Sequence, residues 1–139
     1  MVNSSLIDIL KRQQVKILSI SDGKATINCP LTIDVKPEYK AQLVRWRHLK
    51  EVGIQDFKIR FPKSPRIAHH VEQGYNGIYL TNVYNSWVKN ISIENADSGV
   101  LTENIANVTI EDVITKGENI ALYTVAMSGT YNVLAKGIK

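Results

Sequence analysis

The sequence has a single cysteine and no long apolar run. Cys29 alone excludes an internal disulfide and a cysteine-based zinc site. No stretch reaches the run of about 18 apolar residues that a membrane-spanning helix requires, so no membrane span is expected. The first 14 residues, MVNSSLIDILKRQQ, lack the basic-then-apolar order of a secretion signal. These absences leave two alternatives, a cytoplasmic protein or a part of a longer secreted one.

The sequence also lacks a concentrated run of basic residues. The formal net charge is +4, and the Lys and Arg residues are scattered rather than interleaved with aromatic residues as in proteins that bind single strands. A nucleic-acid partner is therefore not expected. A mild positive charge favours an anionic partner such as an acidic polysaccharide. With 139 residues, 44% of them hydrophobic, the chain is long enough to bury one core.

The N-terminal part, residues 1–51, is predicted to form a short helix followed by a small β-meander. Ser4 or Ser5 can cap a helix over residues 4–13. Asp22-Gly23 lies between two runs of alternating apolar and polar residues, which is a strong hairpin signal because both residues tolerate positive φ. A third run, Leu31–Val35, would complete the meander. The apolar spacing of residues 37–53 fits either a helical turn or an extended connector, and the alternation of Val44 and Trp46 with basic residues favours the extended form.

The remaining part, residues 52–139, contains a repeat. GIQDFKIRF (53–61), WVKNISIENA (87–96) and NIANVTIEDV (104–113) share the spacing apolar-x-x-apolar-x-apolar, and GIYL and GVLT begin a second template at Gly77 and Gly99. A period of about 19 to 25 residues with β-branched runs and no helix is typical of stacked rungs. A leucine-rich repeat is the main alternative for such a period, but it would need recurring Leu and one helix per repeat, and the sequence shows neither. The predicted fold is all-β, a parallel β-helix preceded by the hairpin segment.

Asparagine is predicted to turn the corners between the short strands, because it tolerates a left-handed backbone and bonds to nearby peptide groups. The expected corner residues are Asn76, Asn90, Asn95, Asn104, Asn107, Asn119 and Asn132. The apolar residues between them would then point inward and stack on their equivalents one rung away.

Three segments resemble the pectate-lyase-like superfamily of right-handed parallel β-helix proteins: KEVGIQDFKIRFP (50–62), YNGIYLTNVYNSWVKNISIENADSG (75–99) and ANVTIEDV (106–113). The resemblance implies a right-handed coil and a carbohydrate-active protein that acts on or binds acidic polysaccharide, outside the cell or in its envelope. An active member would be a polysaccharide lyase or a glycoside hydrolase. Because this superfamily includes tailspikes and adhesins, the alternative is a non-catalytic binding or adhesion module, or an inactive fragment.

Three residues are candidate catalytic groups. His69 and His70 lie in the longest irregular stretch, PKSPRIAHHVEQGYN, and Asp97 lies in NADSG. Paired histidines can act as a base or bind a metal, although such a pair on a loop is more often neither. For Asp97 the competing interpretation is a turn residue that accepts hydrogen bonds from the amides of Ser98 and Gly99.

Five residues are candidate substrate-binding groups, because aromatic faces suit stacking on sugars and Arg suits uronate carboxylates. They are Arg66, Tyr75, Tyr79, Tyr84 and Trp87. Simple packing against the neighbouring strand is the alternative role of Trp87.

The sequence implies no cofactor. Calcium is the one conceivable metal ion, but it takes about six to eight oxygen ligands, and outward-facing Glu94 and Glu111 supply too few. A cross-rung ion pair between Arg60 and Glu94 is the simpler expectation.

The last repeat, ENIALYTVAMSGTYNVLAKGIK, ends in mid-pattern without a polar cap. Solenoid ends need such a cap, since otherwise strand edges and core residues are exposed. The sequence therefore predicts further β-helix rungs, or a second chain, at the open C-terminal end.

Overall fold

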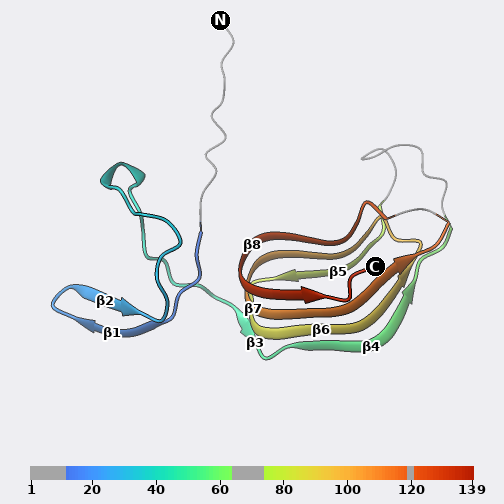
Figure 1. Cartoon of the computed structure of the whole chain (residues 1–139), viewed down its shortest axis with the longest axis horizontal. Helices are drawn as coiled ribbons and strands as arrows, with labels where there is room; N and C mark the ends of the chain where they lie inside the picture. The colour runs from blue at the N-terminus through green and yellow to red at the C-terminus, as the bar shows by residue number, and fades with distance from the viewer. Residues whose placement is uncertain (1–11, 64–73, 119–120) are drawn as a thin grey trace, which may run out of the picture.

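The computed structural model describes residues 12–63, 74–118 and 121–139, and strands dominate it (Figure 1). An antiparallel hairpin of β1 (Ile17–Ser21) and β2 (Lys24–Ile27) precedes one short 3-10 turn, η1 (Pro37–Tyr39). A parallel sheet follows, made of β3 (Leu49–Lys50), β4 (Gly53–Arg60), β5 (Asn76–Thr81), β6 (Val83–Glu94), β7 (Ser98–Lys116) and β8 (Tyr123–Lys136). The prediction of an all-β chain is confirmed. None of the described helical residues forms a helix long and apolar enough to cross a membrane.

The hairpin forms where the sequence predicts it. Asp22 and Gly23 turn the chain with φ values of 50° and 72°. The prediction of a third strand over Leu31–Val35 is wrong, because this run is exposed and irregular. The side chain of Gln13 accepts a hydrogen bond from the Thr32 amide at 2.8 Å, which satisfies a backbone donor that a strand would have given to a neighbouring strand. The predicted helix falls almost wholly on residues 1–11, which lie outside the described residues.

The parallel strands form four consecutive passes of the chain: β3 with β4, β5 with β6, β7, and β8. β4 pairs with β6 at an offset of 34 residues, for example Gly53 with Trp87. The second and third passes pair at an offset of 22, and the third and fourth at 25, for example Ser98 with Tyr123. Because every pairing is parallel and keeps its offset, equivalent residues of successive passes form straight columns across the sheet.

The core lies inside a bend of this sheet. β7 and β8 each turn back on themselves, so the two halves of the sheet face one another (Figure 1). The inward-facing columns are aliphatic, such as Val88 with Ile110 and Ile91 with Val113. The eight largest fully buried side chains are all Ile or Val from the second and third passes: Val88, Ile91, Ile93, Val100, Ile105, Val108, Ile110 and Val113. The first and fourth passes cover this core on either side.

Residues with positive φ also align in columns. One column contains Asn85, Asn107 and Asn132, and another contains Asn82, Asn104 and Gly129. Asparagine and glycine adopt this conformation more readily than other residues, so each column bends the sheet at the same place in the second, third and fourth passes. Positive φ confirms the prediction for Asn90, Asn95, Asn104, Asn107 and Asn132. Asn76 instead begins β5, and Asn119 lies outside the described residues.

Candidate functional site

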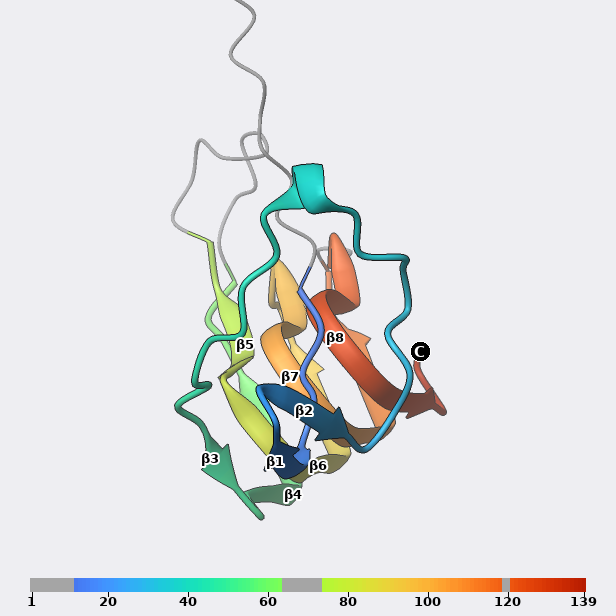
Figure 2. The ribbon, with the colours of Figure 1, turned by 90° about the vertical axis from the view of Figure 1, so that its left-hand side faces the viewer.

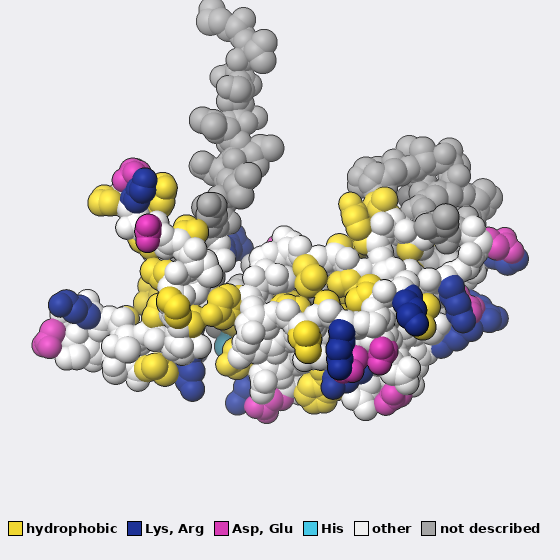
Figure 3. Space-filling model, in the orientation of Figure 1, with side chains coloured by type: hydrophobic (Ala, Val, Ile, Leu, Met, Phe, Trp, Pro, Cys, Tyr) yellow, Lys and Arg dark blue, Asp and Glu magenta, His cyan; other side chains and the backbone are white. Residues whose placement is uncertain are grey.

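Basic side chains gather on the outward face of the parallel sheet. The register places Arg60 beside Glu94 and Glu94 beside Lys116. Figure 3 shows Lys and Arg side chains grouped over the right-hand half of the sheet. We call this surface the cationic face and define it by Lys58, Arg60, Lys89, Lys116 and Lys136, which come from β4, β6, β7 and β8.

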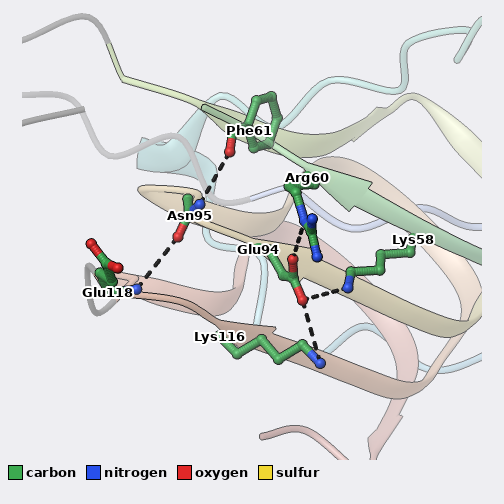
Figure 4. Close-up of polar contacts among 7 residues, drawn as sticks. All are labelled: Lys58, Arg60, Phe61, Glu94, Asn95, Lys116 and Glu118. Atoms are coloured by element: carbon green, nitrogen blue, oxygen red, sulfur yellow. Dashed lines mark hydrogen bonds and ion pairs between the residues drawn. The ribbon is translucent and has the colours of Figure 1, made fainter. Parts of the chain in front are cut away.

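Glu94 lies at the centre of one half of the cationic face (Figure 4). Its carboxylate oxygens lie 2.5 Å from Lys58 Nζ, 2.5 Å from Arg60 Nε and 3.5 Å from Lys116 Nζ. Hydrogen bonds from Lys58 and then Arg60 lower the pKa of Glu94 from 4.5 to about 2. The expected pair of Arg60 with Glu94 is therefore confirmed, and two further cations share the same carboxylate.

Glu111 is the centre of the other half. Lys136 Nζ lies 2.6 Å and Lys89 Nζ 3.5 Å from its carboxylate oxygens. The hydrogen bond from Lys136 lowers the pKa of Glu111. Across the whole face, five cations thus surround two carboxylates. One carboxylate compensates one positive charge, so positive charge remains in excess at the surface.

A cleft of about 570 Å³ lies next to Glu94. Its polar lining is Arg60, Lys63, Glu94, Asn95, Lys116 and Glu118. Lys63 and Glu118 form an ion pair across two connections. Asn95 holds the wall together, since its side-chain amide donates to the Phe61 carbonyl at 3.1 Å and accepts from the Glu118 amide at 3.4 Å.

An aromatic pair adjoins this cleft. Phe61 lines the cleft and stacks on Tyr75, with 5.0 Å between the ring centroids and 19° between the planes. The combination of exposed cations with a nearby aromatic wall suits a polymer that has both acidic groups and apolar ring faces.

Asp97 joins neighbouring passes of the chain through hydrogen bonds. Its carboxylate accepts a hydrogen bond from the Tyr75 amide at 2.6 Å, and its backbone bonds to Tyr75 and Leu122 in the passes on either side. The expected turn role had the Ser98 and Gly99 amides as donors, whereas the donor in the structure is the Tyr75 amide of the preceding pass. His69 and His70 lie outside the described residues, so their predicted role stays a prediction.

The predicted aromatic binding residues are dispersed. Tyr75 stacks on Phe61, which lines the cleft, whereas Tyr79 is exposed on β5 and its hydroxyl donates to Glu103. Trp87 covers Gly53 and donates to Gln55 Oε1 at 2.8 Å, so it packs across two passes on the outward face. Arg66 lies outside the described residues. The structure therefore places Tyr75 against Phe61 and Tyr84 in a different aromatic group.

Tyr84 belongs to a second aromatic group that sequence reasoning missed. Trp46 and His48 stack with ring centroids 4.4 Å apart, and both meet Tyr84 edge-on. Trp46 and His48 precede the parallel strands. Only their alternation with Arg45 and Arg47 indicates in the sequence that they share one side.

Within residues 12–63, 74–118 and 121–139, no three His, Cys, Asp or Glu side chains form a group that could hold a metal ion. No protein-family model, curated protein or solved structure matches the chain.

Proposed function

We propose that the chain is part of a right-handed parallel β-helix of the pectate-lyase-like kind. Constant parallel offsets, aligned columns of left-handed corner residues and an aliphatic core inside the bent sheet all support this fold. Such a protein would act outside the cell or in its envelope. A crystal structure tests the proposal, and a left-handed coil or a sheet that leaves the core open along its length would contradict it.

We further propose that the cationic face binds acidic polysaccharide. The observation that carries this proposal is the excess of cations around Glu94. Three basic side chains share this single carboxylate, and their exposed fractions are 42% for Lys58, 69% for Arg60 and 55% for Lys116. Asp56 and Asp112 lie in a further column of positive-φ residues on the same strands, and basic side chains still outnumber acidic ones. A regularly charged polymer lying along the sheet would meet these cations in succession.

The chemistry of Glu94 favours binding over hydrolysis at this place. Glycoside hydrolysis needs one carboxyl group that delivers a proton and a second that acts as base or nucleophile. With its pKa lowered to about 2, Glu94 remains ionised near neutral pH and holds no proton to deliver. Its chemical role is to fix the three cations in position, so the proposal is a binding surface rather than a hydrolytic centre.

Affinity measurements with polygalacturonate and a neutral glucan test the function. We expect the chain to bind polygalacturonate and not the glucan, with affinity falling at least about tenfold between about 0.05 and 0.5 M salt because screening weakens exposed charge pairs. The double substitution Arg60→Gln with Lys116→Gln removes two cations of the face. It should weaken binding by about tenfold or more.

A matched control is Lys24→Gln with Lys40→Gln, which removes the same charge from the N-terminal part. Equal losses in the two double variants would show that net charge alone drives binding and would contradict a localised face. The same incubations are assayed for new reducing ends and for the ultraviolet absorbance of unsaturated uronates. Products from the intact chain would establish catalysis in place of binding alone.

A further inference from the structure

A separate pocket lies at the bend of the sheet, away from the cationic face. It has a volume of about 130 Å³. Its lining combines side chains of the sheet with the segment before β1: Gln14, Val15, Lys16, Trp46, His48, Tyr84, Ala106, Asn107 and Tyr131. Figure 2 shows the N-terminal segment, in blue, passing over the bends of β7 and β8. Gln14 anchors this segment by donating to the Gly129 carbonyl at 3.4 Å.

The pocket exists because one column of the sheet contains a small residue. Tyr84, Ala106 and Tyr131 are equivalent in three successive passes. Neighbouring parallel strands lie about 4.8 Å apart, so the two tyrosines start about twice that distance from each other. Ala106 leaves the space between them unfilled. Its own side chain is 1% exposed and forms the floor.

The polar groups around the pocket differ in whether they already have a hydrogen-bond partner. Asn107 donates to the Tyr84 hydroxyl at 3.0 Å and accepts from Asn132 at 2.8 Å, so these amides are already paired. Gln14 Oε1, in contrast, is buried and has no hydrogen-bond partner among the described residues. A buried acceptor without a donor costs free energy, and a ligand hydroxyl would remove that cost.

The size and chemistry of the pocket point to one class of ligand. A cavity of about 150 Å³ accommodates benzene, so this pocket has room for one ring face, while the exocyclic groups of a sugar would stay at its mouth. Aromatic walls suit the apolar face of a sugar, and the free acceptor suits a hydroxyl donor. We propose that the pocket binds one pyranose ring, with a ring hydroxyl donating to Gln14 Oε1. This inference deepens the proposed carbohydrate binding by adding a subsite for a single sugar.

The two tryptophans of the chain allow a direct test, because each reports on one place. Trp87→Phe leaves Trp46 in the pocket as the only indole, and Trp46→Phe leaves Trp87 on the outward face. Both variants are titrated with D-galactose, D-galacturonate and open-chain sorbitol, and tryptophan emission is recorded. We expect a saturable change with the ring sugars only in the Trp87→Phe protein, and none with sorbitol.

Two further substitutions in the Trp87→Phe background examine the pocket itself. Gln14→Met keeps the length of the side chain but removes the acceptor, and should weaken sugar binding about tenfold. Ala106→Leu fills the space and should abolish it, whereas Thr109→Leu, on the outward face of the same strand, should leave it unchanged. Far-ultraviolet circular dichroism checks folding. If Ala106→Leu does not fold, the Gln14→Met result decides.

Several outcomes would overturn the inference: equal responses from the two single-tryptophan proteins, an equal response to sorbitol, or unchanged affinity in Gln14→Met. The failure of this subsite is distinguishable from failure of the cationic face. Loss of polygalacturonate binding in the Arg60→Gln, Lys116→Gln protein, together with flat monosaccharide titrations, would leave the face standing and remove the pocket. Unchanged polygalacturonate binding in the Arg60→Gln, Lys116→Gln protein, together with saturable monosaccharide titrations, would leave the pocket standing and remove the face.

Discussion

Glu94 shows how one side chain can organise a surface. Its three cationic neighbours come from the first and third passes, so the carboxylate joins strands that are not adjacent to each other. Exposed ion pairs contribute little to stability one at a time. Their value here is positional, because without the carboxylate Lys58, Arg60 and Lys116 would repel one another and separate.

The lowered pKa of Glu94 predicts a pH dependence of stability. The unfolded chain has the ordinary pKa of 4.5 and the folded chain about 2, so between these values the unfolded state binds more protons. The stabilising contribution is therefore complete above pH 4.5 and is lost as the pH falls towards 2. Denaturation of the wild type and of Glu94→Gln should show a difference in unfolding free energy that is constant at neutral pH and vanishes near pH 2.

Glu38→Gln serves as the control for this measurement, because Glu38 lies in η1 and not on the sheet. It should show no comparable convergence with the wild type. A Glu94→Gln difference that persists unchanged to pH 2 would mean that the ionised carboxylate does not contribute to folding.

The asparagine columns predict a second effect of single residues. Asn107 has a φ of 53° and bonds through its side chain to both Asn132 and Tyr84. Asn107→Ala loses these bonds and strains the backbone, so we expect about 2 to 3 kcal/mol of destabilisation in urea unfolding. Asn107→Gly loses the bonds but relaxes the backbone, and should cost less. A larger cost for Gly than for Ala would contradict the conformational explanation.

At the scale of the element, β7 is the central strand of the parallel sheet. It pairs with β6 and β5 on one side and with β8 on the other, and its inward side chains form the centre of the core. Its 19 residues pass through the bend without leaving the strand conformation for long, because Asn104 and Asn107 absorb the change of direction.

Two isoleucines of β7 give a matched test of this arrangement. Ile110 is fully buried, and Ile114 is 38% exposed on the outward face. Ile110→Ala should lower the free energy of unfolding by about 2 to 5 kcal/mol through lost contacts and a cavity. Ile114→Ala should cost less than about 1 kcal/mol. Comparable losses at the two positions would mean that the inward and outward faces are assigned wrongly.

Periodicity made the strands predictable, and contacts between distant residues made the sites unpredictable. The apolar spacing of residues 53–61, 87–96 and 104–113 reports which side chains face inward, and the register of β4, β6 and β7 follows it. The pair of Arg60 with Glu94 followed from the same periodicity. The pocket did not, because it needs Gln14 from the N-terminal segment to lie beside Tyr131, 117 positions away. No local pattern encodes that approach.

The missed details have a similar cause. Leu31–Val35 has the composition of a strand, but the Gln13 side chain competes for its backbone. The positive φ of Asp56 was not predicted, because no asparagine marks a corner in residues 53–61. Both errors come from weighing residue types without their partners in the neighbouring passes.

At the scale of the whole molecule, β8 is the exposed edge of the sheet. Among the described strands it pairs only with β7, and its side chains include Met127 at 49% and Leu134 at 55% exposure. Further rungs, or a second chain, at this edge remain a prediction. Sedimentation velocity over a concentration series should reveal association through the edge, since unpaired apolar strands tend to pair.

Met127→Lys places a charge on this edge and should shift the chain towards the monomer. Leu18→Lys makes the same change on the exposed hairpin and should leave association unaltered. A monomer at all concentrations in the wild type, or an equal effect of the two lysines, would exclude self-pairing through β8.

The differing offsets between passes have a consequence for how such a chain can vary. All of the difference between 34, 22 and 25 residues falls in three connections, residues 61–75, 95–97 and 117–122, while the paired strands keep their lengths. The strands that precede them, β4, β6 and β7, end at the same end of the sheet, on the right in Figure 1. Loop length costs little free energy, about 0.6 kcal/mol for each doubling. Sequence can therefore be inserted or removed at this end, beside the cleft at Glu94, without changing the register of the core.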